Sequence, residues 1–163
     1  MKKFICAILM AGVLLCGCSN SSSEDIANTI TEGANESVES LYATAEALTD
    51  EKMVKLEDSY ILNYYGIDTS KFSEYVFAQA ESPMSAQTII IARAKDGEDV
   101  SGYKENIENV MEQKVGEMVN YNLPDQVKLI EYAEVRVSQK GICVVISPKA
   151  ETIAPNIQKG LNL

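Results

Sequence analysis

The side chains best suited to chemistry in this sequence are its four cysteines, because the chain contains no histidine. Two of them, Cys16 and Cys18, end a segment that starts with Lys2 and Lys3 and continues through an uncharged apolar run at 4–15. A basic start followed by about a dozen apolar residues has the proportions of a secretory signal and is too short to span a bilayer stably. We therefore expect this segment to direct the rest of the chain out of the cytoplasm.

The end of this segment, Leu15-Cys16-Gly17-Cys18, resembles the lipobox of bacterial lipoproteins, in which a cysteine is diacylated and becomes the first mature residue. In this interpretation Cys18 carries the lipid, and the signal peptidase recognises Leu15 and Gly17. Lipidation at Cys16 would instead place the bulky Leu15 where a small residue is required. An ordinary secretory signal and an N-terminal anchor helix are the alternatives. The sequence thus predicts a signal peptide over 1–17 and a diacylglyceryl anchor, with fatty acids such as palmitate, on Cys18.

The last cysteine, Cys143, lies inside an apolar run at 141–146. With Cys6 and Cys16 removed and Cys18 lipidated, it has no partner for an intramolecular disulfide. It is either a reactive thiol or a small buried hydrophobic residue, and the absence of an activating histidine favours the second. The same absence excludes imidazole-base catalysis, Ser-His-Asp triads and the commonest zinc ligand.

Ser101 and Lys104 have the Ser-x-x-Lys spacing of penicillin-interacting enzymes, in which a helix places the lysine one turn from the nucleophile. The partner motifs Ser-Asp-Asn and Lys-Thr-Gly are missing, and the chain is much shorter than that fold. This pair supports one alternative function, a small enzyme of the cell envelope that uses Ser101 and Lys104 or paired carboxylates.

Acidic residues form two groups. Asp96, Glu98 and Asp99 offer hard oxygen ligands for Ca²⁺, but the EF-hand spacing is not present, and capping of the next helix is the competing interpretation. The second group lies along one face of that helix and indicates either a solvated surface or a paired-carboxylate site. Its members are Glu105, Glu108 and Glu112.

Three tyrosines, Tyr60, Tyr64 and Tyr65, are the aromatic candidates for a pocket or an interface, because their rings are amphipathic. Packing between a helix and a sheet is the other interpretation. Tryptophan is absent, which weakens the case for sugar stacking, and neither Gly-x-Gly-x-x-Gly nor a P-loop occurs. We expect no cofactor.

Length and charge bound the remaining possibilities. Removal of 1–17 from the 163 residues leaves 146, enough for one domain with a real core. Because 1–17 carry Lys2 and Lys3 and no acid, the formal charge falls from −10 to −12. Such a surface repels nucleic-acid phosphates and anionic headgroups, so we expect no nucleic-acid partner, and acyl chains must hold the protein on the membrane. A polar tether at 18–25 precedes a single domain at 26–163.

The apolar periodicity predicts an α+β fold. We expect a two-layer sandwich with a four-stranded antiparallel sheet (β-β-α-β-β-α), helices on one face and an N-terminal helical segment. The two strands at 86–94 and 142–146 should lie in the centre of the sheet, and the strands at 74–80 and 133–138 at its edges. The predicted elements are helices at about 25–41 and 50–65, strands at 74–80 and 86–94, a long helix at about 100–118, strands at 133–138 and 142–146, and a last helix at about 148–161 that Pro155 should kink or divide.

Besides the lipobox, the chain contains Tyr64-Tyr65-Gly66-Ile67-Asp68, Ala94-Lys95-Asp96 at an acidic helix start, Tyr121 with Leu123-Pro124-Asp125-Gln126-Val127, and a hairpin at 135–146 with a central glycine. With these features the chain resembles a family of bacterial lipoproteins, domain-of-unknown-function family 4358, common in Gram-positive anaerobes. The resemblance covers roughly residues 50–160. It implies an extracytoplasmic location and supports the α+β architecture, and it carries no catalytic residue.

These observations favour a membrane-tethered extracytoplasmic lipoprotein that is not an enzyme and acts as a binding or adaptor domain. Its expected partners are the cell membrane, through the lipid, and a protein of the envelope. The alternatives are the small envelope enzyme and an accessory lipoprotein that captures a solute for a transporter. Small size counts against the last, since such receptors normally close two lobes around their ligand.

Overall fold

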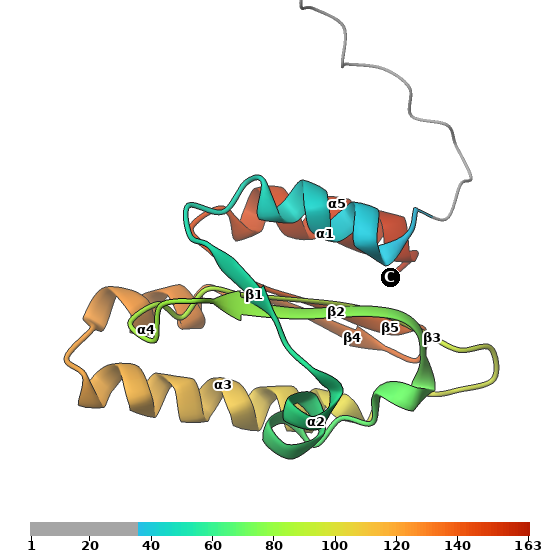
Figure 1. Cartoon of the computed structure of the whole chain (residues 1–163), viewed down its shortest axis with the longest axis horizontal. Coiled ribbons are helices and arrows are strands. Elements are labelled where there is room, and N and C mark those ends of the chain that lie inside the picture. The colour runs from blue at the N-terminus through green and yellow to red at the C-terminus, as the bar shows by residue number, and fades with distance from the viewer. Residues whose placement is uncertain (1–35) are drawn as a thin grey trace, which may run out of the picture. The chain divides into compact units, whose positions relative to one another are not determined.

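The structure, a computed structural model, describes residues 36–163. Five antiparallel strands form one sheet in the order β1-β2-β3-β5-β4, and helices cover both of its faces (Figure 1). The strands are β1 (Met53–Lys55), β2 (Phe72–Ala80), β3 (Thr88–Ala94), β4 (Glu134–Ser138) and β5 (Gly141–Ile146). The helical segments are α1 (Val38–Glu46), α2 (Asp58–Tyr60), the π-helix η1 (Ile61–Tyr65), the 3₁₀ turn η2 (Thr69–Lys71), α3 (Tyr103–Asn120), α4 (Pro124–Glu131) and α5 (Ala150–Leu161).

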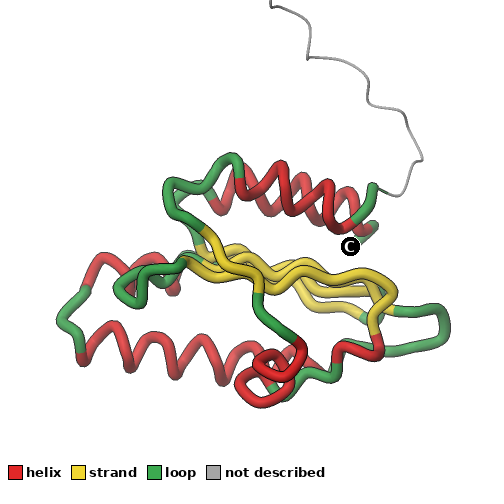
Figure 2. The backbone as a smooth tube through the Cα atoms, in the orientation of Figure 1, coloured by secondary structure: helices red, strands yellow, loops and turns green. Residues whose placement is uncertain are grey.

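Two-sided burial of the central strands organises this architecture. All of β5 and the first five residues of β3 are buried. Because side chains alternate across a sheet, each strand supplies apolar side chains to both faces. Ile89 and Ile91 pack with α1 and α5, whereas Ile90 packs on the side of α3 and α4. We call these sides the α1–α5 face and the α3 face; Figure 2 shows the helices in two groups on opposite sides of the strands.

The predicted α+β class with an antiparallel sheet is therefore confirmed, and two of its details are wrong. Helices cover both faces because the central strands are apolar on both. The sheet has five strands because β1 pairs with the outer edge of β2, with Met53 opposite Ala80 and Lys55 opposite Ala78. The predicted central position of β3 and β5 is confirmed, as is the edge position of β4, whereas β2 is an inner strand.

The predicted helix at 50–65 is wrong over its first half, where β1 forms instead. Pairing with the free edge of β2 outweighs a weak helical pattern there. The second half is helical, and Gly66 ends it in the left-handed conformation, with φ 65°, as the sequence predicts. Asn106 of α3 fastens this end, since its Nδ2 donates to the carbonyl oxygens of Tyr65, at 3.1 Å, and of Gly66, at 3.3 Å.

The remaining helices agree with the sequence in part. The long helix is confirmed as α3. The chain breaks after it as predicted, but α4 then forms with Pro124 in its first turn, which the prediction missed. The last helix is not divided, because Pro155 and Glu151 both lie on its exposed side, where water can bond the carbonyl that Pro155 leaves free. Of the predicted first helix, the part before residue 36 lies outside the described residues.

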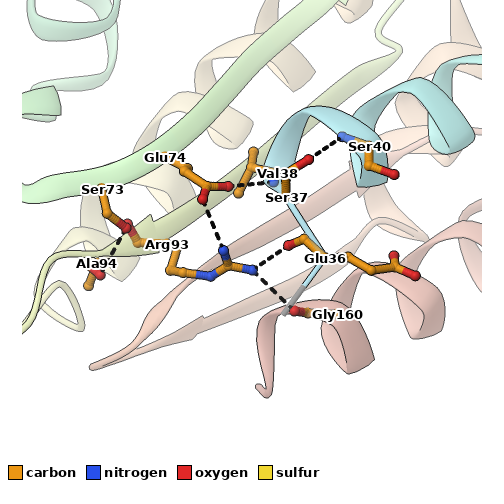
Figure 3. Close-up of polar contacts among 9 residues, drawn as sticks. All are labelled: Glu36, Ser37, Val38, Ser40, Ser73, Glu74, Arg93, Ala94 and Gly160. Atoms are coloured by element: carbon orange, nitrogen blue, oxygen red, sulfur yellow. Dashed lines mark hydrogen bonds and ion pairs between the residues drawn. The ribbon is translucent and has the colours of Figure 1, made fainter. Parts of the chain in front are cut away.

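An ion pair fastens both terminal helices to the sheet (Figure 3). Arg93 of β3 pairs with Glu74 of β2, with 3.3 Å between Nη1 and Oε1. Its Nη2 also donates to the carbonyl oxygens of Glu36, at 2.7 Å, and of Gly160, at 3.2 Å. The other carboxylate oxygen of Glu74 accepts the first N–H of α1, from Val38, at 2.7 Å. The network satisfies groups that helix ends leave free and fixes where the described chain enters the domain.

Gly141 is required by the close approach of β5 to β3 at this position. A Cβ at this position would lie 2.3 Å from the carbonyl oxygen of Ala92 on the neighbouring strand. Backbone of a central strand cannot move away without breaking its ladder, so we expect Gly141→Ala to lower the free energy of unfolding by about 2–3 kcal/mol in urea titrations.

Gly116→Ala is the matched control, because it lies inside α3 with nothing within 4 Å of the added Cβ. Alanine favours a helix over glycine by up to about 1 kcal/mol, so this variant should be more stable than the wild type. Equal stability of the two variants would contradict the tight approach of β5 to β3.

Candidate functional site

A pocket of about 370 Å³ lies on the α3 face, between η1, the turn that joins β2 to β3, and the second half of α3. Gln126 of α4 supports the same turn, since its Oε1 accepts the N–H of Ala86 at 2.8 Å. Most of the lining side chains are polar or aromatic, which distinguishes the pocket from the core behind it. The lining residues are Tyr60, Tyr64, Gln79, Ala80, Glu81, Ser82, Pro83, Ser85, Lys114, Glu117, Met118 and Tyr121.

Helix α3 contributes the most unusual of these side chains, Lys114. The buried residues of this helix include Val110, Lys114 and Met118, which are four residues apart and so share one face. The lysine therefore takes a core position on an otherwise apolar stripe. It is 7% exposed, the same fraction as the core residue Met53.

The ammonium group of Lys114 has no counter-charge in contact with it. Among residues 36–163, no carboxylate lies within ion-pair distance of its Nζ and no protein group accepts a hydrogen bond from it, although the Nζ atom itself is not fully enclosed. Burial lowers the pKa of Lys114, and the more distant charge of Glu117 opposes that shift. Lysine is almost never buried unless it is paired, and an unpaired buried charge is unfavourable for folding. A side chain of this kind in a pocket is a functional-site candidate.

Two tyrosines form an aromatic wall of the pocket. The ring centroids of Tyr60 and Tyr64 are 5.3 Å apart, and the two ring planes are tilted by 30°. Burial raises the pKa of Tyr64 to about 12, and the charge of Glu117, which also lines the pocket, adds to this shift. Tyr65 has a different role. It is buried, and its ring stands edge-on to Phe77 at 5.6 Å. The structure thus places two of the three predicted tyrosines in a pocket and one in the core.

The pocket also contains two carboxylates, which differ in their surroundings. Glu81 pairs with Lys52, with 2.7 Å between Oε1 and Nζ. Glu117 has no ion pair within the described part of the chain. One cation and one anion, Lys114 and Glu117, therefore lie in the same pocket without a direct partner. Sequence reasoning missed both. The four-residue spacing of Lys114 from Val110 and Met118 is the one signal that marks the lysine.

The structure does not assemble Ser101 and Lys104 into a nucleophile and its base. The hydroxyl of Ser101 donates to Oδ1 of Asp99 at 2.6 Å. The ammonium of Lys104 instead pairs with Glu108 at 3.5 Å, and both Ser101 and Lys104 are exposed. The tetrad is thus a turn and a surface ion pair at the beginning of α3.

The acidic groups also have structural surroundings. Hydrogen bonds from Ser101 to Asp99 hold the pKa of that carboxyl below its usual range, and Gln139 donates to the other oxygen at 3.2 Å. Glu98 pairs with Lys71 at 3.7 Å. Within residues 36–163, no cluster of three histidine, cysteine, aspartate or glutamate side chains is arranged to hold a metal ion. Three predicted acids lie on the exposed face of α3: Glu105, Glu108 and Glu112.

Cys143 is a fully buried side chain of β5, which confirms the interpretation as a small hydrophobic residue. Burial raises the pKa of its thiol to about 12, and the charge of Glu134 adds to the shift. The thiolate needed for reactivity is therefore disfavoured. The predicted lipidation residue Cys18, the peptidase residues Leu15 and Gly17, and the predicted tether at 18–25 lie outside the described residues.

Residues 46–147 match the family described as domain of unknown function (DUF4358), which covers more than half of the chain. The chain belongs to this family. The DUF4358 region contains every residue that lines the pocket, whereas α5 lies outside it and α1 lies almost wholly outside. The pocket therefore lies wholly within the matched part of this chain. The chain has no significant match among curated proteins or among solved structures. Within residues 36–163, no helix is both long enough and apolar enough to cross a bilayer.

Replacement of Lys114 by methionine should stabilise the protein. Methionine has similar length and removes the unpaired buried charge, so we expect Lys114→Met to raise the free energy of unfolding by about 1–2 kcal/mol at pH 7. Lys104→Met on the exposed side of the same helix is the control and should change stability by less than about 0.5 kcal/mol. Urea titration of both variants measures the difference.

The gain from Lys114→Met should also depend on pH. Since burial lowers the pKa of Lys114 below its ordinary 10.5, the unfolded state binds more protons than the folded state between the folded-state pKa and 10.5. At pH values below that window, Lys114 is charged in the folded state and its burial lowers the free energy of unfolding of the wild type by the largest amount. As pH rises through the window, Lys114 loses its proton and this cost disappears. The gain should be larger at pH 7 than at pH 10, and a gain independent of pH would contradict the buried charge.

Proposed function

We propose that this protein is a membrane-anchored extracytoplasmic lipoprotein whose DUF4358 domain binds a small polar ligand without converting it chemically. One observation carries the proposal: the side chain of Lys114 is buried in a tyrosine-lined pocket, and no carboxylate of residues 36–163 lies within ion-pair distance of its ammonium. A residue that weakens the folded state is typical of a site where function, not stability, determines the side chain. A ligand that pairs with Lys114 would relieve the unfavourable burial, and that relief would contribute to affinity.

The non-enzymatic part of the proposal is supported by the state of the candidate nucleophiles. Ser101 and Lys104 are bonded to different neighbours. Cys143 is buried with a raised pKa, and the sequence contains no histidine. A protein that captures a ligand without converting it must pass it on or report it, which agrees with the expected protein partner in the envelope.

The anchoring part of the proposal rests on the sequence. The segment that ends at Cys18 supplies a signal and a lipidation site, and the acidic mature chain makes electrostatic adhesion to anionic lipids unfavourable. A single acyl chain binds membranes only marginally, so the diacyl group is required for stable attachment.

Binding can be tested with the purified full chain in a thermal-shift assay against sodium acetate, sodium phosphate, methylammonium chloride and glycine. We expect at least one of these compounds to raise the melting temperature of the wild type and of Lys104→Met, and to leave Lys114→Met unchanged. The proposal fails if none acts, or if each acts equally on Lys114→Met.

Anchoring can be tested by replacing each cysteine of the proposed lipobox in bacterial cells. Cys18→Ala should abolish incorporation of an alkyne-labelled fatty acid and move the protein out of the membrane fraction. Cys16→Ala is the matched control and should remain lipidated and membrane-bound. Loss of label in Cys16→Ala with label retained in Cys18→Ala would refute the assignment of Cys18.

A further inference from the structure

We infer that the pocket recognises a small zwitterion of the size of an amino acid or dipeptide, with the ligand carboxylate at Lys114 and its ammonium group at Glu117. This inference rests on the proposed binding function and specifies the ligand class for the same site. It follows from the charges, aromatic rings and volume of the pocket, each of which limits the ligand independently.

The charges limit the ligand first. Of the three charged side chains that line the pocket, Glu81 is neutralised by Lys52 at 2.7 Å. Lys114 and Glu117 are three residues apart on α3, a spacing that often allows an ion pair, yet they do not form one. A purely anionic ligand would satisfy Lys114 but would be repelled by Glu117 and by a chain of net charge −10. A neutral zwitterion would satisfy both groups and escape that repulsion.

The aromatic wall limits the orientation. The charge of Glu117 raises the pKa of Tyr64, so the carboxylate and this ring are close enough to interact. An ammonium group at Glu117 would thus lie beside the wall formed by Tyr60 and Tyr64. Tyrosine faces attract cations within about 6 Å of the ring centroid. The ligand carboxylate is directed to Lys114, the one cationic side chain among the lining residues.

The volume limits the size. At about 370 Å³, the pocket lies near the lower end of the roughly 300–1,000 Å³ typical of small-molecule sites. Gln79, Ser82 and Ser85 add uncharged hydrogen-bonding groups to the lining. These groups suit the amide of a short peptide between its two charged ends, and they offer little apolar surface to a larger hydrophobic side chain.

Isothermal titration of the purified full chain with three related peptides tests the inference. The probes are L-alanyl-L-alanine, its N-acetyl form and its C-terminal amide, which carry both charges, the carboxylate alone and the ammonium alone. We expect the free dipeptide to bind at least about tenfold more tightly than either capped form, because each cap removes one charge-assisted contact.

Variants assign each charge to its residue. Lys114→Met should lose the preference for a free carboxylate over the amide while it keeps the preference for a free amine. Glu117→Gln should lose the preference for a free amine over the N-acetyl form while it keeps the preference for a free carboxylate. Lys104→Met and Glu112→Gln, on the exposed face of the same helix, should bind as the wild type does.

The outcomes separate this inference from the binding function. Capped peptides that bind as tightly as the free one would overturn zwitterion recognition. A Lys114-dependent thermal shift with acetate or phosphate, together with no binding of any peptide, would also overturn it and leave the binding function intact. No response to any of these compounds would overturn both.

Discussion

Burial of β3 and β5 on both faces is the constraint on which the rest of the domain depends. Consecutive isoleucines and valines in these strands point to alternate faces of the sheet and so need apolar partners on both sides. Helices α1 and α5 cover one side, and α3 and α4 cover the other. The ion pair between Arg93 and Glu74 then holds the ends of α1 and α5 on the first face. On the second face, Asn106 of α3 fastens the end of η1 and Gln126 of α4 supports the turn between β2 and β3, and η1 and this turn close the edge of the face.

The pocket lies where this second core ends. Helix α3 must present one continuous face to the sheet, and position 114 falls on that face between Val110 and Met118. An apolar residue there would extend the core, whereas a lysine leaves a desolvated charge beside an open space. The domain therefore gives up some stability at one position, and it does so inside the region that defines its family. This coincidence of burial, missing counter-charge and cavity is the basis for a binding function.

The strongest local patterns predicted most of the fold. The run Ile89-Ile90-Ile91 fixed a central strand, and Gly66 marked the end of a helix. Strand β1 escaped prediction because its three residues are too few to show alternation and depend on the edge of β2. The sequence suggested a tyrosine pocket but not its charges. Position 114 is recognisable only once the face of α3 is known, and its pocket requires three segments that are distant in the chain. The signal and lipidation assignments concern residues that the structure does not describe.

Ligand binding in the pocket depends on Lys114 being a buried cation that lacks a counter-charge until a ligand supplies one. Carbon-detected NMR of the full chain with ¹³C-labelled lysines measures this directly, through the pH titration of each Cε resonance. We expect the Lys114 resonance to titrate below the ordinary lysine value of 10.5, and its titration to move to higher pH when L-alanyl-L-alanine is added. A Lys114 resonance that titrates at the ordinary value, with or without the dipeptide, would contradict a buried charge that a ligand neutralises.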